Sequence, residues 1–382
     1  MNLQKIRSEF PHLQTDQIYF DHAAVSPLCN RSRNYLERYI NTVQSDKINS
    51  FEDTLNLSER IRKNISTLLH TNQGRIAIVK NTTDGLILLA RGLSWQPGDN
   101  IVLYRNEFPS NVYPWYDLKY LGVKVKFIDS KLGKVTPIEL ESIVTKKTKL
   151  VSVSWVQYSS GYRNDLKELA DWCHDRNIIL AVDAMQGLGA LDLNVEETSI
   201  DFLSTGTAKW LLGPHGIGFI YLTKQLQDKL NPPHLGWYSR QDMMNFHDYD
   251  QPLKTDASRF EFATPFSLGI WAFAGATEIL LESGSVEIEN RIINLTDYLV
   301  NGLNDIGLQV ISDRSSSAVK SGIVYVSHPN KNNNEKIYNR LDELRGSISL
   351  RNNKLRISPH FYNTHTEIDK FLNIIESITN KL

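Results

Sequence analysis

The sequence has few cysteines and no long run of apolar residues. Its 382 residues include only Cys29 and Cys173, which are far apart and form no C-x-x-C pair. This spacing predicts neither a disulfide framework nor a metal site. No segment approaches the roughly 20 apolar residues that cross a bilayer, and the N-terminus lacks the apolar core of a signal peptide. We therefore expect two reduced thiols, no membrane partner and a cytoplasmic location.

A surplus of positive charge is also absent. Lysine and arginine number 42 and aspartate and glutamate 43, which gives a formal net charge of -1. Affinity for phosphate polymers depends on a basic surplus, so we expect no nucleic-acid partner. Hydrophobic residues make up 41% and charged residues 22% of the chain, as in folded proteins. The length suits two domains of ordinary size.

Short apolar runs alternate with longer amphipathic stretches up to about residue 223. Helix-like stretches at 83–93, 110–121, 136–144 and 165–176 separate most of these runs, and two more precede them near 30–48 and 52–70. The runs predict strands at 75–80, 100–104, 123–128, 149–156, 177–183, 200–205 and 216–222. This alternation predicts an α/β fold with crossover connections and a mainly parallel sheet.

The pattern changes after residue 223. Residues 231–251 are polar and aromatic without periodicity, which predicts a long functional loop. The rest predicts an α+β unit, with helices at 264–305, 334–344 and 366–380 and strands at 320–326, 346–350 and 354–357. We expect a large domain over 26–255 and a small domain over 256–382. The N-terminal segment 1–25 is expected to pack on the small domain.

Two motifs combine an acid and a lysine at the predicted sheet edge. Asp183 ends a buried apolar strand in VDAMQG (182–187), and Lys209 lies in STGTAKWLLGPHGIGF (204–219). Ligands of open α/β sheets bind beyond the carboxyl ends of the strands, where an acid can pair with a cationic ring nitrogen. A lysine in an apolar surround has a lowered pKa, and its neutral amine can form a Schiff base. Asp183 as a helix cap and Lys209 as a solvated charge are the alternatives.

Two further motifs offer anion-binding groups. Thr82 and Thr83 lie where a strand gives way to a helix, whose free N–H groups and dipole can bind a phosphate. Arg356 lies in a short strand, and its guanidinium suits a carboxylate. An ordinary N-cap and a surface salt bridge are the alternatives. Together the four motifs supply the parts needed to hold pyridoxal phosphate and an α-amino acid.

The order of these motifs resembles the class V aminotransferases, which include cysteine desulfurases, selenocysteine lyases and isopenicillin N epimerase-like proteins. The resemblance extends from YFDHAA (19–24) to the last helix and rests on NTTDG (81–85), EFPSN (107–111), VDAMQG (182–187), KWLLGPHG (209–216), RFEFATP (259–265) and RISPHFYNT (356–364). It implies the fold type I of pyridoxal-phosphate-dependent transferases, with a seven-stranded, mainly parallel sheet and a smaller α+β C-terminal domain. It also implies a homodimer with shared active sites.

The resemblance implies a role for each motif residue. Lys209 would bind the cofactor as a Schiff base and move protons, and Asp183 would keep the ring nitrogen protonated. The other contacts would be Gln186 at the ring hydroxyl, Phe108 stacked on the ring, Thr82, Thr83 and Thr205 or Thr207 at the phosphate, Thr264 at the phosphate of the neighbouring subunit's cofactor, Arg356 at the substrate carboxylate, and Ala23 and Ala24 along the substrate pocket.

Some positions depart from the family pattern. Phe108 stands where desulfurases stack a histidine, and Ala208 stands where many members have a histidine before the lysine. Tyr158 or Gln157 occupies the region that contacts the ring oxygen in desulfurases. The segment 345–356 contains no cysteine and is too short for the loop that carries a persulfide-forming thiol. Cys173 is not expected to replace it, because it lies in an apparent amphipathic helix.

These features favour a pyridoxal-phosphate-dependent enzyme that acts on a small amino acid. The predicted reaction is a β-elimination, including C–S cleavage without a protein persulfide relay, or an epimerisation. A class V aminotransferase and a cofactor-binding protein without activity are the alternatives, because α-proton removal begins transamination as well.

Overall fold

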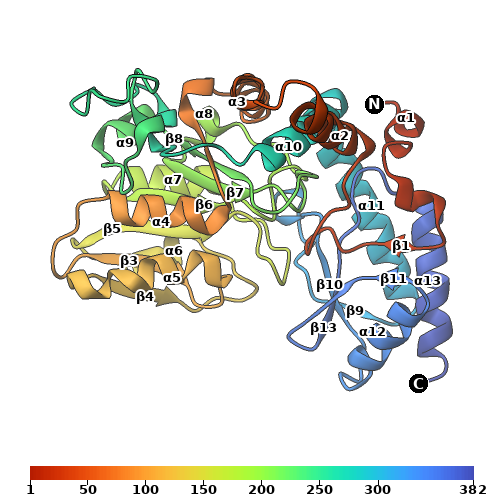
Figure 1. Ribbon diagram of the computed structural model, residues 1–382. Helices are drawn as coiled ribbons and strands as arrows, with labels where there is room; N and C mark the ends of the chain where they lie inside the picture. The colour runs from red at the N-terminus through yellow and green to blue at the C-terminus, as the bar shows by residue number, and fades with distance from the viewer.

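The computed structural model describes residues 1–382, and its main element is a seven-stranded sheet with helices on both faces (Figure 1). The strand order is β2-β8-β7-β6-β5-β3-β4, and only β8 runs antiparallel to its neighbours. The strands are β2 (Ile76–Val79), β3 (Asn100–Tyr104), β4 (Lys124–Ile128), β5 (Thr148–Ser154), β6 (Ile179–Asp183), β7 (Phe202–Gly206) and β8 (Gly218–Leu222). All seven strands predicted for this region are confirmed, as is the mainly parallel sheet.

Helices cover this sheet because alternate strand residues face two separate hydrophobic cores. In β6, Leu180 and Val182 pack into one core, while Ala181 between them packs into the other. The helices of this region are α2 (Asn30–Ser45), α3 (Phe51–Leu68), α4 (Thr82–Gly92), α5 (Tyr113–Tyr116), α6 (Pro137–Glu141), α7 (Leu166–His174), α8 (Val195–Thr198), α9 (Lys224–Lys229) and α10 (Ser267–Ser283). Side chains of α4 and α5 contribute to one core, and those of α3, α7 and α10 to the other.

A second unit, at the lower right of Figure 1, contains a four-stranded antiparallel sheet of order β12-β13-β10-β9. Its elements are α11 (Ser285–Asp305), β9 (Gln309–Val310), β10 (Val324–Ser327), α12 (Asn333–Glu343), β11 (Gly346–Ser347), β12 (Ser349–Arg351), β13 (Lys354–Ile357) and α13 (His365–Thr379). A capping box between Thr364 and Glu367 begins α13. The α+β character of this region is confirmed.

The N-terminal segment lies against this second unit. It contains α1 (Leu3–Arg7) and β1 (Ile18–Tyr19), and β1 pairs in parallel with β11. Arg7 also forms an ion pair with Glu367 at 2.8 Å. The domain boundaries at residues 25 and 255 stay predictions. None of the helices combines the length and apolar character needed to cross a membrane.

Two predicted helices are interrupted. Residues 110–121 form α5 between two 3₁₀ turns, η3 (Pro109–Asn111) and η4 (Asp117–Leu121), because Pro114 has no N–H to donate to the carbonyl of Ser110. Residues 264–305 form α10 and α11, separated by Gly284 with φ +76°. The remaining 3₁₀ turns are η1 (Pro11–Gln14), η2 (Gln73–Arg75), η5 (Trp237–Ser239), η6 (Ala257–Phe260) and η7 (Ser317–Val319). The predicted loop 231–251 is irregular apart from η5 and an isolated bridge between Arg240 and Leu253.

Candidate active site

A cavity of about 230 Å³ lies beyond the carboxyl ends of β5, β6 and β7. This is the edge of an open α/β sheet where ligands bind. The residues around it are Asn81, Thr82, Thr83, Phe108, Ser110, Ser154, Tyr158, Asp183, Met185, Gln186, Gly206, Thr207, Ala208, Lys209, His215, Gly216 and Ile217. The fold therefore brings Lys209, Asp183 and the start of α4 to one cavity.

Lys209 follows β7 and lines the cavity. Burial, and then the positive charge of Arg356, lower the pKa of its amine to about 8, while the negative charge of Asp183 acts in the opposite direction. Its Nζ lies 5.6 Å from the centre of the Phe108 ring. A sizeable fraction of this amine is therefore neutral near pH 8 and able to attack an aldehyde.

Asp183 is the last residue of β6 and is 5% exposed. Burial raises the pKa of its carboxyl group to about 6, while the Met185 N–H, which donates to Oδ1 at 2.9 Å, acts in the opposite direction. A cationic ring nitrogen placed here would compensate the buried negative charge. The carboxyl group therefore suits the pyridinium of pyridoxal phosphate.

The N-terminus of α4 faces the same cavity. Asn81 caps the helix by accepting from the Asp84 N–H at 2.9 Å, and the N–H groups of Thr82 and Thr83 have no partner within the helix. A Cβ on Gly85 would lie 2.3 Å from Ser204 Oγ, so only glycine lets α4 approach β7 this closely. The helix end and the amine thus fit a phosphorylated aldehyde, with the phosphate at α4.

The hydroxyl groups before the lysine differ in position. Thr207 lines the cavity and donates to the Pro214 carbonyl at 2.8 Å. Thr205 lies outside the lining residues and donates to the Gly206 carbonyl at 2.9 Å. Thr207 is therefore better placed than Thr205 for a phosphate contact.

Gln186 lines the cavity, but other groups engage its amide. Its Nε2 donates to the Ala23 carbonyl at 3.0 Å, and its Oε1 accepts from Trp210 Nε1 at 3.0 Å. Ala23 is buried and Ala24 half-buried, and neither lies among the lining residues of the cavity. The roles of Gln186, Ala23 and Ala24 stay predictions.

Two aromatic side chains contact each other at the cavity. The ring centres of Phe108 and Tyr158 are 5.3 Å apart with an interplanar angle of 70°. Tyr158 lines the cavity, whereas the Gln157 amide donates to Glu107 at 3.0 Å. Of the two residues between which the sequence did not decide, Tyr158 is the one that faces the cavity.

Arg356 comes from β13 of the second unit and is only 2% exposed. Its Nη1 donates to the Tyr158 carbonyl at 2.9 Å, and its Nη2 donates to Ser349 Oγ at 3.0 Å and lies 3.4 Å from Asp21 Oδ1. Its buried Nε has no partner. Arg356 is not among the lining residues of the cavity, but internal contacts hold it beside Tyr158, which is, and its buried Nε is left without a partner.

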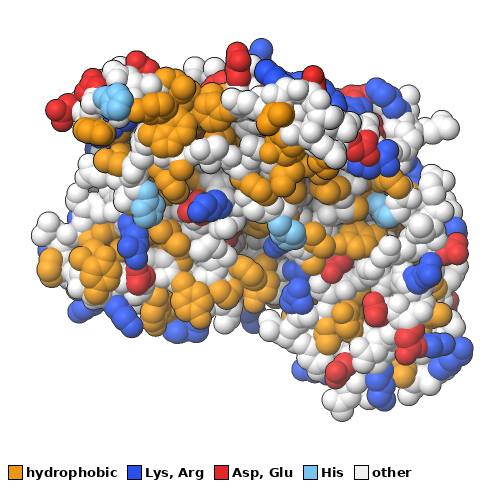
Figure 2. All heavy atoms as spheres, viewed as in Figure 1, with side chains coloured by type: hydrophobic (Ala, Val, Ile, Leu, Met, Phe, Trp, Pro, Cys, Tyr) orange, Lys and Arg blue, Asp and Glu red, His pale blue; other side chains and the backbone are white.

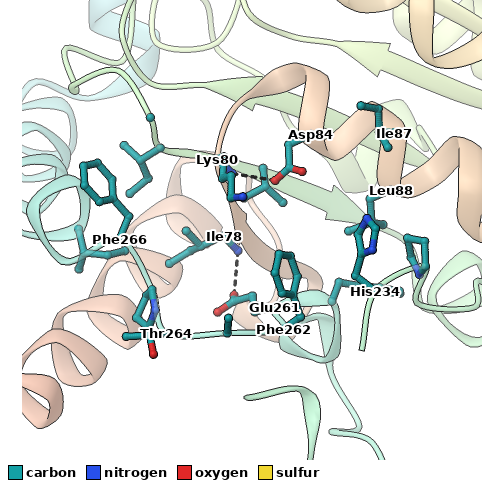
Figure 3. Close-up of a pocket in the computed structure, with 18 residues that line it drawn as sticks. Ile78, Lys80, Asp84, Ile87, Leu88, His234, Glu261, Phe262, Thr264 and Phe266 are labelled. Carbon is teal, nitrogen blue, oxygen red and sulfur yellow. Dashed lines mark hydrogen bonds between the residues drawn. The ribbon is translucent and has the colours of Figure 1, made fainter. Parts of the chain in front are cut away.

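Thr264 does not reach this cavity. It is exposed and lines a neighbouring cavity of about 420 Å³, shown with Glu261, Phe262 and Phe266 in Figure 3. The two cavities share only Gly216 and Ile217. A contact between Thr264 and the cofactor of a neighbouring subunit would need a second chain, so this role of Thr264 stays a prediction.

Sequence reasoning gave no role to Glu107 and Asp21. Both lie in quoted motifs, Glu107 directly before Phe108 and Asp21 directly before His22. For Glu107 the usable signal was an acid directly before Phe108, and for Asp21 it was an acid two residues before Ala23; Phe108 and Ala23 had been assigned to the site. What the sequence could not show is that these acids face buried donors in distant segments.

Comparison with known proteins agrees with this geometry. The family model for class-V aminotransferases matches residues 18–371. A probable cysteine desulfurase of Pyrococcus abyssi is 27% identical over 99% of this chain and 98% of its own length, and an uncharacterised aminotransferase of Bacillus subtilis is 26% identical over 96% and 95%.

Solved structures share the whole fold. The apo cysteine desulfurase of Thermococcus onnurineus superimposes with a TM-score of 0.87 at 25% identity, covering 99% of this chain and 98% of that one. A cystine C–S lyase in complex with its product cysteine persulfide has a TM-score of 0.87 at 22% identity, covering 96% and 99%. The chain belongs to the class-V aminotransferase family and is a pyridoxal-phosphate-dependent enzyme of fold type I.

Proposed function

We propose that this enzyme is a lyase that removes a β-substituent, such as sulfur, from a small amino acid without a protein persulfide. The observation that carries the proposal is the Lys209 amine, whose pKa burial lowers to about 8, in one cavity with the Asp183 carboxyl group. Bound pyridoxal phosphate supplies an electron sink for the bond broken at the substrate α-carbon.

The residues of the chain would divide the remaining work. Lys209 would hold the cofactor covalently and, once released by the substrate amine, would take the proton from the α-carbon as a general base. Asp183 would hold a proton on the ring nitrogen. Arg356 would bind the substrate carboxylate through the Nε donor that has no internal partner.

The positions of the thiols support elimination without a relay. Cys29 and Cys173 are both buried, are not bonded to each other and lie outside the cavity lining. Burial raises the pKa of Cys173 to about 12. Because the thiolate is the nucleophile, a thiol in such a site does not accept sulfur from a substrate.

The products distinguish the candidate reactions. Purified enzyme loaded with pyridoxal phosphate is incubated with cysteine, cystine and related amino acids, and pyruvate, sulfide, alanine and racemisation are measured. Elimination from cysteine gives pyruvate and sulfide in equal amounts. Alanine in place of pyruvate would indicate desulfuration, and racemised substrate alone an epimerase. An amine form of the cofactor that an oxo acid reverses would indicate an aminotransferase.

We further propose that the enzyme is a homodimer and that it works in the cytoplasm. The cavity that Thr264 lines is concave and largely apolar, and Phe266 at its edge is 51% exposed. Figure 2 shows further hydrophobic side chains gathered at the upper left of this face, near α9. A second copy of the chain would cover such a surface and bring its own Thr264 towards the cofactor.

A further inference from the structure

Glu107 is a buried acid that the proposed reaction leaves unused. It lies between β3 and η3 and is 5% exposed. Its Oε1 accepts from the Ser154 N–H at 2.9 Å and from Gln157 Nε2 at 3.0 Å, and its Oε2 accepts from the Ser154 hydroxyl. No lysine, arginine or histidine forms an ion pair with it.

Such a group is costly to bury. Burial raises the pKa of Glu107 to about 7, and the nearby Asp183 carboxyl group raises it as well. Asp183 is the register partner of Ser154 in the adjoining strand, so the two acids approach each other at one sheet edge. Three neutral donors compensate a buried carboxylate only in part. Packing alone therefore does not account for a carboxyl group at residue 107.

The residues that follow this network in sequence both line the cavity. Phe108 comes directly after Glu107, and Tyr158 directly after Gln157. The Glu107–Gln157 hydrogen bond ties the two loops together one residue before the point where the Phe108 and Tyr158 rings meet at 5.3 Å. A change in the Glu107–Gln157 hydrogen bond therefore shifts the contact between the Phe108 and Tyr158 rings.

Each ring lies beside a group needed for the reaction. The Phe108 ring faces the Lys209 amine at 5.6 Å, and the Tyr158 carbonyl accepts from Arg356 at 2.9 Å. The hydrogen bonds of Glu107 thus connect the stacking ring at the cofactor with the arginine at the substrate carboxylate.

We propose that Glu107 is a positioning residue of the cofactor site, whose carboxyl group sets the Phe108 ring over the cofactor and the Tyr158 carbonyl beside Arg356. The proposal rests on the proposed cofactor site and not on which reaction the enzyme catalyses. It can therefore fail while the proposed lyase function stands, and it can stand if the reaction proves to be a different one.

The test compares Glu107→Leu and Glu107→Gln with Asp201→Asn. Asp201→Asn is a control for a general loss of stability, because Asp201 accepts from the Leu180 N–H at 2.9 Å at the opposite edge of the same sheet, where it also pairs with His174. For each loaded enzyme we would measure the dissociation constant for pyridoxal phosphate, the visible circular dichroism of the bound cofactor, and KM and kcat for the amino acid.

Leucine leaves three buried donors without an acceptor, so Phe108 and Tyr158 lose their alignment. We expect Glu107→Leu to weaken cofactor binding about tenfold or more, to reduce the visible dichroism and to raise KM. Glutamine keeps the shape, and its carbonyl can still accept from the Ser154 N–H and from Gln157, while its amide N–H donates to the Ser154 hydroxyl. Glu107→Gln should therefore restore all three values towards wild type.

Overall instability alone would lower the melting temperature of Glu107→Leu and Asp201→Asn without altering the cofactor's dichroism. Unchanged cofactor affinity, dichroism and KM in Glu107→Leu would overturn the proposal. If that variant does not fold, Gln157→Leu removes one of the same hydrogen bonds and must show the same changes in direction. An unaffected Gln157→Leu would then overturn it.

Discussion

The two cavities that share Gly216 and Ile217 differ in the side chains that line them. The cavity at Lys209 holds an amine, a carboxyl group, a helix N-terminus and an aromatic ring, all from segments between residues 81 and 217. The cavity at Thr264 is larger, about 420 Å³, and its lining is mostly apolar, with Lys80, Asp84, His234 and Glu261 as its ionisable side chains.

The two acids of the second cavity already bond to other groups of the chain. Glu261 accepts from the Ile78 N–H at 2.8 Å and pairs with Arg62, and Asp84 accepts from the Lys80 N–H at 3.0 Å (Figure 3). The Lys209 cavity, in contrast, contains groups whose pKa values are displaced towards neutrality. Such displaced groups suit proton transfer. The groups of the first cavity thus suit chemistry, whereas we propose the second as a surface for contact with a second copy of the chain.

Removing the amine should have the largest effect and should be confined to the first cavity. We expect Lys209→Ala to abolish covalent cofactor attachment and turnover, because no other lysine lines that cavity. The fold should remain, since the substitution removes a desolvated charge. The visible absorbance of the bound cofactor, the mass of the borohydride-reduced protein and the melting temperature test this. Lys229→Ala, at the end of α9, is the matched control.

Full activity in Lys209→Ala would show that the chemistry lies elsewhere. Loss of folding in the same variant would show that Lys209 is a structural residue, and the distinction between the two cavities would then fail.

Some residues of this site could be predicted from the sequence, and others could not. Asp183, Lys209 and the Thr82–Thr83 pair could be predicted because each lies at or shortly after the end of a strand, and parallel strands bring their carboxyl ends to one edge. The partners of Arg356 could not, since Asp21 is 335 residues away in sequence and meets it only after the N-terminal segment packs on the second unit. Tyr158 and Gln157 are neighbours, so only backbone direction decides which one faces the cavity.

The Asp183 carboxyl group should affect activity and stability in opposite directions. On the proposed role of Asp183 at the ring nitrogen, loss of its negative charge in Asp183→Asn should lower kcat by at least about a hundredfold, as for other preorganised electrostatic contacts. In the apo-protein, the raised pKa of about 6 means that the folded state binds a proton which the unfolded state has released. The contribution of this proton to stability is complete below about pH 4 and is lost as the pH rises through about 6.

The asparagine side chain in the Asp183→Asn variant carries no charge at any pH, so the apo variant should avoid that loss. We expect the substitution to stabilise the apo-protein by up to about 3 kcal/mol at pH 8, and by much less at pH 4.5. Urea unfolding of both apo-proteins at the two pH values checks the sign. A variant that is less stable than wild type at pH 8 would mean that the carboxylate is compensated in the folded chain.

A charged residue in the cavity that Thr264 lines should affect dimer formation more strongly than catalysis. Phe266 is 51% exposed at the edge of that cavity, and a carboxylate there would oppose the association of two apolar surfaces. We expect Phe266→Asp to shift the protein from dimer to monomer in sedimentation velocity and to weaken cofactor binding moderately. Ile138→Asp is the control, because Ile138 is 83% exposed on α6.

If wild type sediments as a monomer, or if Phe266→Asp remains a dimer with unchanged cofactor affinity, the second cavity has another use. Thr264 would then have no part in the site.

The smallest effect is expected for substitution of the two cysteines, which lie outside the lining of the Lys209 cavity. If sulfur leaves the substrate directly from the Lys209 cavity, Cys173→Ala should retain wild-type rates of pyruvate and sulfide formation. The only expected change is a loss of about 1 kcal/mol in stability from the smaller buried side chain.

The double variant with Cys29→Ala extends the test to both thiols, and its melting temperature separates misfolding from loss of chemistry. Because both cysteines lie outside the cavity lining, a large loss of sulfide release in a folded cysteine-free enzyme would require a thiol to reach the site by a rearrangement. Retained activity would confine the sulfur chemistry to the groups that surround Lys209.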